Sequence, residues 1–296
     1  MTLVSVILPT FNRAHCLRRA ACSVLAQSHS ELELVIVDDA SSDDTHDVVR
    51  KLGDPRVRYV RLDRNSGPAA ARNAGIKLAR HALIAFQDSD DEWLPGKLAA
   101  QLATLAAAPP EVALVSCGLV RHDPPAVFVF PPPVLLHGDS RRTIRMHAIA
   151  FSQTWLVRRE IFDRYGLFDE KLRIWEDWEF LLRVTRGHRV HYLADRLVLS
   201  YLSADAISAS TQRRIDSLER IVTLHPTDKY LRGRLHYLVG RFAALSGDAL
   251  KARRFLWMSI HCRPLYVRAW ALLVVSVAGA DAMRSALSLR SKPTKP

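Results

Sequence analysis

Short β-rich runs alternate with helix-like stretches through the first 120 residues, and this alternation limits the possible folds more than any other feature. The β-rich runs are Val4–Leu8, Leu32–Val37, Val57–Leu62, Leu83–Gln87 and Val112–Cys117. The helix-like stretches lie near 15–27, 44–52, 68–80 and 95–107. This order predicts an α/β fold in which helices cover both faces of a mostly parallel sheet. Because such sheets bind ligands beyond the carboxyl ends of their strands, the residues directly after each strand are the first functional candidates.

The pattern changes after residue 120. Prolines at 124, 125 and 131–133 break regular structure. They predict a long irregular excursion over 121–150, as a mobile acceptor-side loop or a disordered insert. The segments that follow read as an extended run at 152–157, helices near 159–165 and 176–186, and a strand at Val190–Leu193.

From about residue 206 the sequence predicts helices alone. Apolar residues repeat at helical spacing along one stretch, at Leu231, Leu235, Leu238, Phe242 and Leu245. A turn at Gly247 and a second helix as far as Cys262 complete a docked helical hairpin. We therefore predict a catalytic domain over 1–205, with a nucleotide half at about 1–95 and an acceptor half at about 96–205. A basic helical region would occupy 206–296.

The positive charge of the chain is concentrated in that last region. Residues 1–205 hold 26 Lys and Arg against 25 Asp and Glu, whereas residues 206–296 hold 16 against 5. No nucleic-acid-binding motif accompanies this charge, so we expect no nucleic-acid partner. Trp257, Tyr266 and Trp270 lie among the arginines, which favours peripheral contact with an anionic membrane. Contact with an acceptor that carries phosphates and a merely solvated basic face are the alternatives.

The cysteines and the hydropathy pattern indicate a cytoplasmic location. The four cysteines show no CxxC pair and no metal-ligand spacing, so we expect reduced and mostly buried thiols. The first residues lack the features of a signal peptide. The longest apolar stretch, 269–280, is shorter than the roughly 20 residues that a membrane-spanning helix needs. We expect a cytoplasmic protein, with any membrane contact peripheral and on the cytoplasmic face.

Two candidate nucleotide-binding segments follow the first two predicted strands. Pro9, Thr10, Phe11 and Asn12 offer hydrogen-bonding groups and a flat aromatic ring, although an ordinary loop is the alternative. Asp38 and Asp39 end the second strand, where buried acids are costly unless a partner uses them. Such carboxylates bind ribose hydroxyls or base N–H groups in nucleotide-binding α/β folds. Capping of the next helix by Ser42 or Asp43 is compatible with this role.

A third candidate segment, Asn65–Asn73, starts a helix with Gly67 and Pro68. This start leaves backbone N–H groups free for a ligand. Arg72, one turn later, is placed to reach a diphosphate or base, unless it is a solvated surface charge.

The run Phe86–Trp93 after the fourth strand carries four acids in five residues. Asp88, Asp90 and Asp91 would repel one another without a cation. Hard oxygen ligands suit Mg²⁺ or Mn²⁺, which keep positions open for phosphate oxygens. A metal-bridged nucleotide diphosphate is therefore the prediction, with an acidic surface turn as the alternative.

A general base is predicted where the run Ile174–Leu181 opens a helix. Asp177 shares the helical spacing of Phe180, Leu181 and Val184, so we expect it on the buried face. An inward carboxylate between two tryptophans suits a general base, although an acid there also complements the helix dipole. Its neighbours on the acceptor side would be Trp175, Glu176 and Trp178.

Together these segments resemble the family 2 glycosyltransferases, which share the GT-A fold. The matching stretches are VSVILPTFNR, VIVDDASSDDT, NSGPAAARNAG, IAFQDSDDEW and GLFDEKLRIWEDWEFLLR. They cover about residues 3–95 and 166–183. The resemblance implies that Thr10, Phe11, Asp39 and Arg72 hold the nucleotide. It further implies that Asp88, Asp90 and Asp91 form the metal-binding DxD region and that Asp177 is the base.

The resemblance implies an inverting, metal-dependent transfer of a hexosyl group, most simply from a UDP-sugar, to a hydroxyl on a glycan or lipid-linked glycan. Two features depart from the family pattern. Residues 201–208 contain neither the Arg nor the His that many members use beside the metal and phosphates. The QxxRW signature of processive synthases is also missing, which favours single addition. A non-catalytic nucleotide-sugar-binding module and a nucleotidyltransferase are the competing readings.

Overall fold

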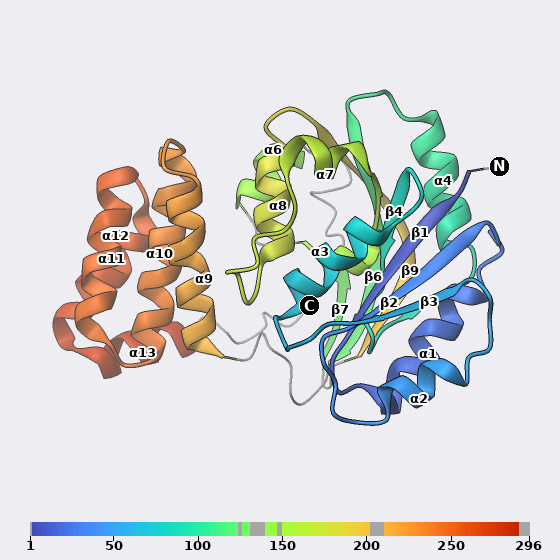
Figure 1. Cartoon of the computed structure of the whole chain (residues 1–296). Helices are drawn as coiled ribbons and strands as arrows, with labels where there is room; N and C mark the ends of the chain where they lie inside the picture. Colours follow the sequence, from blue (N-terminus) through green and yellow to red (C-terminus); the bar gives the residue numbers. More distant parts are fainter. Residues whose placement is uncertain (1, 124–125, 131–139, 147–149, 202–209, 290–296) are drawn as a thin grey trace. The chain divides into compact units, whose positions relative to one another are not determined.

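The computed structural model describes residues 2–123, 126–130, 140–146, 150–201 and 210–289 (Figure 1). The chain separates into two compact units, Met1–Ala204 and Asp205–Pro296. The division lies next to the boundary predicted at residue 205. The assignment of a nucleotide half and an acceptor half within the first unit stays a prediction.

The first half of the sheet is parallel, as the sequence predicted. Its strands are β1 (Val4–Thr10), β2 (Leu32–Asp38), β3 (Val57–Arg61) and β4 (Leu83–Phe86), in the order β3-β2-β1-β4. The connecting helices are α1 (Ala14–Leu25), α2 (Thr45–Arg50) and α3 (Pro68–Leu78), and α4 (Lys97–Ala107) follows the short strand β5 (Glu92–Trp93). Strands β1 and β2 are buried along their whole length, which explains why apolar residues occupy most of their positions on both faces.

The second half of the sheet mixes strand directions. Beyond β4 come β8 (Trp155–Arg158), β6 (Val112–Asp123), β9 (Arg189–Tyr201) and β5. Strand β8 is antiparallel to both β4 and β6, whereas β6 and β9 are parallel. Helices α6 (Ser140–Met146), α7 (Glu160–Tyr165) and α8 (Glu176–Val184) and the short 3₁₀ helix η1 (Ser152–Thr154) complete this unit among the described residues. The fold is thus α/β with a mostly parallel sheet.

The prediction of an irregular excursion over 121–150 is wrong for the residues that the structure describes there. Strand β6 extends to Asp123 and pairs antiparallel with β7 (Ala126–Phe130), and α6 forms a helix further on. The run AVFVF has the composition of a strand, and an available partner in β6 outweighed the nearby prolines. The rest of the excursion, 124–125, 131–139 and 147–149, lies outside the described residues. Strand β9 is also longer than predicted, because it pairs with most of β6 through register shifts.

Close packing of α3 on the sheet depends on Gly75. A Cβ added at this position would lie 2.4 Å from Cγ2 of Ile7 on β1, so a larger residue would push the helix away. Pro68 occupies the first helical turn, where its missing N–H costs nothing. Helix α3 is therefore held at a fixed distance from the sheet, and this distance determines the position of Arg72.

An aromatic cluster anchors α8 to the end of the parallel sheet. Phe180 on α8 stacks on Phe162 of α7, with ring centroids 4.8 Å apart. Phe168 lies between Phe180, at 5.2 Å, and Phe86 on β4, at 5.7 Å. All four rings are buried. Because Phe86 directly precedes the acidic run, this cluster fixes the start of α8 near that run.

The second unit is helical, as predicted. Its elements are α9 (Thr211–Leu224), α10 (Lys229–Leu245), α11 (Ala249–Cys262), α12 (Val267–Val275), the 3₁₀ helix η3 (Ser276–Ala278) and α13 (Ala280–Leu289). Ser210, Asp228 and Asp248 cap α9, α10 and α11 by accepting backbone N–H groups. The predicted α10 stripe holds only in part: Leu231 and Leu235 are buried, whereas Leu245 is exposed.

Two general expectations can be compared with the described residues. All four cysteines are free, but Cys16 and Cys117 alone are buried, and Cys22 is exposed. The prediction of mostly buried thiols was therefore wrong in half of the cases. In the described part of the chain, no helix has both the length and the apolar character needed to cross a membrane.

Candidate active site

Two loops meet at the carboxyl ends of β1 and β2. Pro9 stays within β1, opposite Val37, so the strand ends at Thr10, two residues later than predicted. Asn12 adopts a left-handed conformation with φ of 51°, and its Oδ1 accepts the backbone N–H of Ser42 at 2.8 Å. The backbone N–H of Asn12 donates to Oγ of Ser41 at 2.9 Å. Asn12 therefore joins the two loops to each other, a role that the sequence did not indicate.

The same loops present two groups that fit a nucleotide. Thr10 is buried, and its Oγ1 has no hydrogen-bond partner among the described residues. A buried hydroxyl without a partner is uncommon and costly unless a ligand completes it. The neighbouring Phe11 exposes 42% of its surface, which leaves an aromatic face open to a planar base.

The adjacent acids Asp38 and Asp39 have separate surroundings. Asp38 is fully buried, and its carboxylate accepts from the backbone N–H of Ser41, from the hydroxyl of Tyr59 and from Arg61. These contacts tie the end of β2 to β3. Its predicted contact with a nucleotide stays a prediction, and its carboxylate already has three protein partners.

Asp39 instead shapes the third loop. Its two carboxylate oxygens accept the backbone N–H groups of Ser66 and Gly67, at 2.8 and 2.7 Å. Burial raises the pKa of Asp39 despite these bonds. Gly67 has φ of 96°, and a Cβ there would lie 3.0 Å from a guanidinium nitrogen of Arg173. The segment before α3 is thus held in one conformation by a carboxylate at the end of β2.

Arg72 connects the acidic run to the start of α8. Its Nη2 donates to Asp88 at 2.7 Å, and its Nη1 donates to Glu176 at 2.6 Å. The side chain is buried, and both carboxylates raise its pKa further above the ordinary value. Arg72 is therefore a buried ion-pair centre and not the solvated surface charge of the alternative reading. The side chain of Arg72 therefore contacts both residue 88 and residue 176.

The three acids of the DxD region face different surroundings. Asp91 is buried, and its carboxylate accepts from the side chain of Gln153 at 3.0 Å and from the backbone of Tyr201 at 3.2 Å. Burial together with Asp88 and Asp90 raises the pKa of Asp91 to about 8. Asp90 is half-buried, and burial and Asp88 raise its pKa as well. Like charges are held close together here, and of these three acids it is Asp88 that pairs with Arg72.

This donor set fits a divalent cation in one particular way. In the described part of the chain, no three His, Cys, Asp or Glu side chains converge as a metal site. The Asp91 carboxylate is already bonded to Gln153 and Tyr201. Mg²⁺ is commonly held by one or two carboxylates and by substrate phosphates. Asp88 and Asp90 supply that number, and the raised pKa of Asp90 indicates a negative site that a cation would relieve.

The start of α8 places a second set of groups beside Arg72. Asp177 is half-buried, and its Oδ1 accepts the backbone N–H of Trp178 at 2.7 Å. Burial and the Glu176 carboxylate raise the pKa of Asp177 to about 8, and Arg72 opposes this shift. A carboxylate with a raised pKa accepts a proton more readily near neutral pH, as a general base must.

The residues predicted on the acceptor side are placed differently from one another. Trp178 is fully buried and donates from its indole N–H to the carbonyl of Ile144, so its role is to fix α8 against α6. Glu176 is buried in its ion pair with Arg72. Trp175 is half-buried and has a left-handed φ of 64°. Of the three, Trp175 has the surface best suited to an acceptor, and acceptor contact by each stays a prediction.

Several residues that organise this site were missed by the sequence analysis. Asn73 donates to the carbonyl of Phe168 and to Glu170, and it accepts the backbone N–H of Phe168. These bonds tie α3 to the segment before α8. Gln153 reaches Asp91 from η1. Asn73 stands next to Arg72 in a segment already identified, whereas nothing near Gln153 in the sequence indicates its role.

Comparison with known proteins identifies the family. The family model for glycosyl transferase family 2 matches residues 5–166, more than half of the chain. The chain belongs to glycosyl transferase family 2. The matching family is a family of glycosyl transferases, which favours the enzymatic reading over a non-catalytic module and over a nucleotidyltransferase.

Some relatives are named for polysaccharide biosynthesis or for glucosyl transfer. The succinoglycan biosynthesis protein ExoO of Rhizobium meliloti is 36% identical over 188 residues, which are 60% of this chain and 54% of that protein. An Escherichia coli protein, WfaP, is named UDP-Glc:α-D-GlcNAc-diphosphoundecaprenol β-1,3-glucosyltransferase. It is 37% identical over 102 residues, 34% of this chain and 41% of that protein. The chain thus spans about half the length of these relatives.

Solved structures share the whole fold. Staphylococcus aureus TarS 1–349 in complex with UDP-GlcNAc has a TM-score of 0.69 and 19% identity, covering 96% of this chain and 90% of that one. The mannosyltransferase PcManGT of Pyrobaculum calidifontis, in complex with GDP-Man and Mn²⁺, has a TM-score of 0.61 and 20% identity, with coverage of 95% and 86%. The family 2 glycosyltransferase described here has the GT-A fold that its motifs implied.

Proposed function

We propose that this enzyme is an inverting, metal-dependent glycosyltransferase that adds a single hexosyl group from a nucleotide diphosphate-sugar to a hydroxyl of a glycan or lipid-linked glycan. The observation that carries the proposal is the position of Arg72 between Asp88 and Glu176. It links the acidic run after β4 to the helix start that bears Asp177. A donor diphosphate and an acceptor hydroxyl would therefore be bound by groups that are already in contact.

The donor is best explained as a nucleotide diphosphate-sugar. Among the described residues the buried hydroxyl of Thr10 has no hydrogen-bond partner, and the ring of Phe11 is open to a base. Asp39 orders the loop before α3, whose backbone would approach the nucleotide. A relative is named for UDP-Glc, and TarS was solved with UDP-GlcNAc. These names favour a UDP-sugar as the donor.

Asp88 and Asp90 would hold Mn²⁺ or Mg²⁺, with Asp91 orienting the turn through Gln153 and Tyr201. When bound, such an ion neutralises the charge that develops on the departing diphosphate. The complex of PcManGT with Mn²⁺ supports this choice of ion.

Asp177 is the proposed general base. The acceptor oxygen attacks the anomeric carbon from the face opposite the diphosphate, and its proton passes to the Asp177 carboxylate. The bond between the anomeric carbon and the diphosphate oxygen breaks, and the diphosphate leaves with the electron pair. The transition state resembles an oxocarbenium ion, and the single displacement inverts the configuration. The raised pKa of Asp177 supports this role.

The acceptor and the location are proposed together. A relative is named for a diphosphoundecaprenol-linked acceptor, and others are named for polysaccharide synthesis. We therefore place the enzyme in the cytoplasm, at the cytoplasmic face of a membrane that carries a lipid-linked acceptor. The four free cysteines agree with a reducing compartment.

A binding and turnover experiment tests this function. Isothermal titration with UDP should show tight binding with Mn²⁺ and at least about tenfold weaker binding with EDTA, because two carboxylates alone repel the diphosphate. Asp90→Asn should remove most of the difference, whereas Asp44→Asn, at an exposed acid before α2, should keep it. Slow hydrolysis of labelled nucleotide-sugars should require the same ion. Equal UDP affinity with and without metal would overturn the metal assignment.

A further inference from the structure

Helix α12 of the second unit lacks the polar face that a helix exposed to water normally has. Arg268 is the only charged or polar residue among its nine. Val267, Trp270, Val274 and Val277 recur at i, i+3, i+7 and i+10, so they share one face of α12 and η3. That face is exposed: Val274 shows 68% of its surface and Val277 shows 82%. An exposed apolar stripe of this length indicates a contact surface.

Trp257 on α11 widens the stripe. It exposes 60% of its surface, and its ring meets Trp270 edge-on, with centroids 6.5 Å apart. The indole N–H of Trp270 donates to the carbonyl of Pro264 at 2.7 Å, so the ring is held in place while much of it stays exposed. We call Trp257, Val267, Trp270, Val274 and Val277 together the tryptophan patch.

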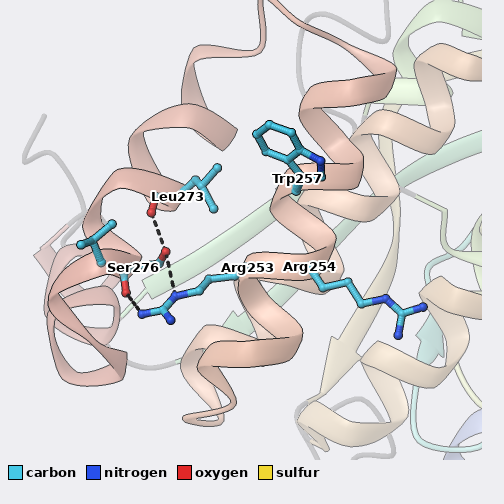
Figure 2. A pocket seen from close by; sticks show the side chains of 6 residues that line it. Arg253, Arg254, Trp257, Leu273 and Ser276 are labelled. Atoms are coloured by element: carbon cyan, nitrogen blue, oxygen red, sulfur yellow. Dashed lines mark hydrogen bonds between the residues drawn. The ribbon is translucent and has the colours of Figure 1, made fainter.

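A pocket of about 600 Å³ opens beside the patch (Figure 2). Trp257, Leu273 and Val277 supply its apolar wall. Arg253 crosses from α11 to Ser276, where it donates to the Ser276 side chain and backbone carbonyl. Arg254, on the same helix, is exposed. Apolar side chains thus lie directly beside guanidinium groups.

The charge of this region favours one kind of partner. Residues 249–280 contain five Lys and Arg and no Asp or Glu. A second copy of the chain would bring the same positive charge to the contact, which disfavours self-association through this face. Tryptophans and arginines side by side are typical of surfaces that meet lipid headgroups: the rings enter the interface, and the arginines meet anionic groups.

We propose that the tryptophan patch, with Arg253, Arg254 and Arg268, docks on an anionic lipid bilayer. The biological purpose, bringing the enzyme to a lipid-linked acceptor, rests on the function proposed above, whereas the docking itself does not. Tyr266 has no part in the surface, although the sequence analysis grouped it with the tryptophans. Its ring is half-buried against Tyr237, at 5.0 Å, and under the guanidinium of Arg263, at 4.3 Å.

Vesicle co-sedimentation of the full-length protein tests the docking. We expect binding to vesicles of phosphatidylcholine with about one-third phosphatidylglycerol, no binding to phosphatidylcholine alone, and loss of binding at high salt. Trp257→Ala and Arg254→Glu should each weaken binding by about tenfold. Arg213→Glu changes the net charge by the same amount at an exposed position on α9, so it should have a smaller effect than Arg254→Glu.

Other occupants give different results. Absence of binding to anionic vesicles at low salt, equal binding to neutral vesicles, or equal effects of Arg254→Glu and Arg213→Glu would each overturn the proposal. Self-association in sedimentation velocity that Trp257→Ala abolishes would identify a second copy as the occupant and also overturn it. Nucleotide-sugar hydrolysis without vesicles is measured on the same samples. Vesicle binding without hydrolysis would count against the proposed function alone, and hydrolysis without vesicle binding would count against the docking alone.

Discussion

The two units of this chain use charged residues in opposite ways. In the first unit, acidic and basic residues nearly balance, and the important ones are buried in contact with each other, as in Asp88–Arg72–Glu176. In the second unit, basic residues outnumber acidic ones by 16 to 6, and α11 and α12 contain no acid at all. Buried pairs fix atoms in place, whereas exposed charges of one sign attract a distant partner.

This difference indicates separate tasks. The first unit holds its acids in strained electrostatic surroundings, as the raised pKa values of Asp90 and Asp177 indicate. Such surroundings are characteristic of sites that bind cations or transfer protons. The second unit has a basic surface on which Trp257 and Trp270 are exposed. Changes in the first unit should therefore affect turnover, and changes in the second should affect attachment.

The largest effect on turnover is expected at Asp177, and it tests whether the first unit carries the catalytic base. Asp177→Asn should lower the rate of sugar transfer by about 10²- to 10⁴-fold, because the acceptor proton loses its base. Affinity for the nucleotide diphosphate should stay within a few-fold, since the substitution is on α8 and the donor groups are on other elements. Steady-state transfer assays and calorimetric titration measure the two effects separately.

The pH profile adds an independent test of the same residue. Burial and Glu176 raise the pKa of Asp177 to about 8, and the base is active when deprotonated. kcat/KM should therefore rise with pH through the neutral range in the wild-type enzyme, and this rise should be absent from the residual activity of Asp177→Asn. Asp163→Asn, at an exposed acid on α7, is the control and should behave as wild type. Full activity in Asp177→Asn would show that the carboxylate is not the base and only complements the start of the helix.

The next largest effect is a loss of stability, expected when the buried ion-pair network is disrupted. Arg72→Met keeps much of the side-chain volume but leaves Glu176 and Asp88 without their cation. The free energy of unfolding should fall by about 3–5 kcal/mol, as when one partner is removed from a buried pair. Denaturant unfolding followed by tryptophan fluorescence measures this change.

Two further variants make the test of Arg72 specific. Adding Glu176→Gln to Arg72→Met should restore part of the lost stability, because no lone buried carboxylate then remains at 176. Arg61→Met removes an arginine that is half-exposed and only one of three partners of Asp38, so it should cost less than about 1 kcal/mol. Similar losses in Arg61→Met and Arg72→Met would contradict the distinction between a buried arginine and a half-exposed one.

Sequence reasoning succeeded where a local pattern determines the structure. The first four strands and the helices between them follow from the apolar period and from Gly67–Pro68, so the parallel half-sheet was predictable. It failed for β7, where the prolines suggested irregular chain but pairing with β6 decided the outcome. Strand pairing depends on a partner distant in sequence, and no local pattern contains that information.

The sequence predicted which residues are candidates for the site, but it did not predict which of them bond to one another. The sequence identified Arg72, Asp88 and Asp177 as separate candidates, because each follows a strand or starts a helix. It could not show that Arg72 bonds both Asp88 and Glu176, since these partners are 16 and 104 residues away. Nor could it separate Asp38, which is bonded to Tyr59, from Asp39, which orders the Gly67 loop.

The smallest expected effect extends the comparison to the second unit, which buries a titratable base without an acidic partner. His236 on α10 is 2% exposed, and neither ring nitrogen has a hydrogen-bond partner among the described residues. Burial and Arg232 lower the pKa of His236 to about 4. Between about pH 6.5 and 4 the unfolded chain therefore binds a proton that the folded unit does not. This contribution to stability is fully present above pH 6.5 and is lost as the pH falls, by about 1.4 kcal/mol per pH unit.

Hydrogen exchange of the α10 amides, corrected for the intrinsic exchange rate, measures this loss locally. His236→Phe keeps a ring beside Phe255, whose centroid lies 5.6 Å from that of His236, and it removes the proton-binding site. As the pH is lowered from 6.5 to 4, the α10 amides of the wild type should steadily lose protection relative to those of His236→Phe. His261→Gln removes an exposed histidine from α11 and should leave the slope unchanged, because that ring meets water in both states. Parallel pH slopes in wild type and His236→Phe would show that the ring is protonated in the folded unit as readily as in the unfolded chain.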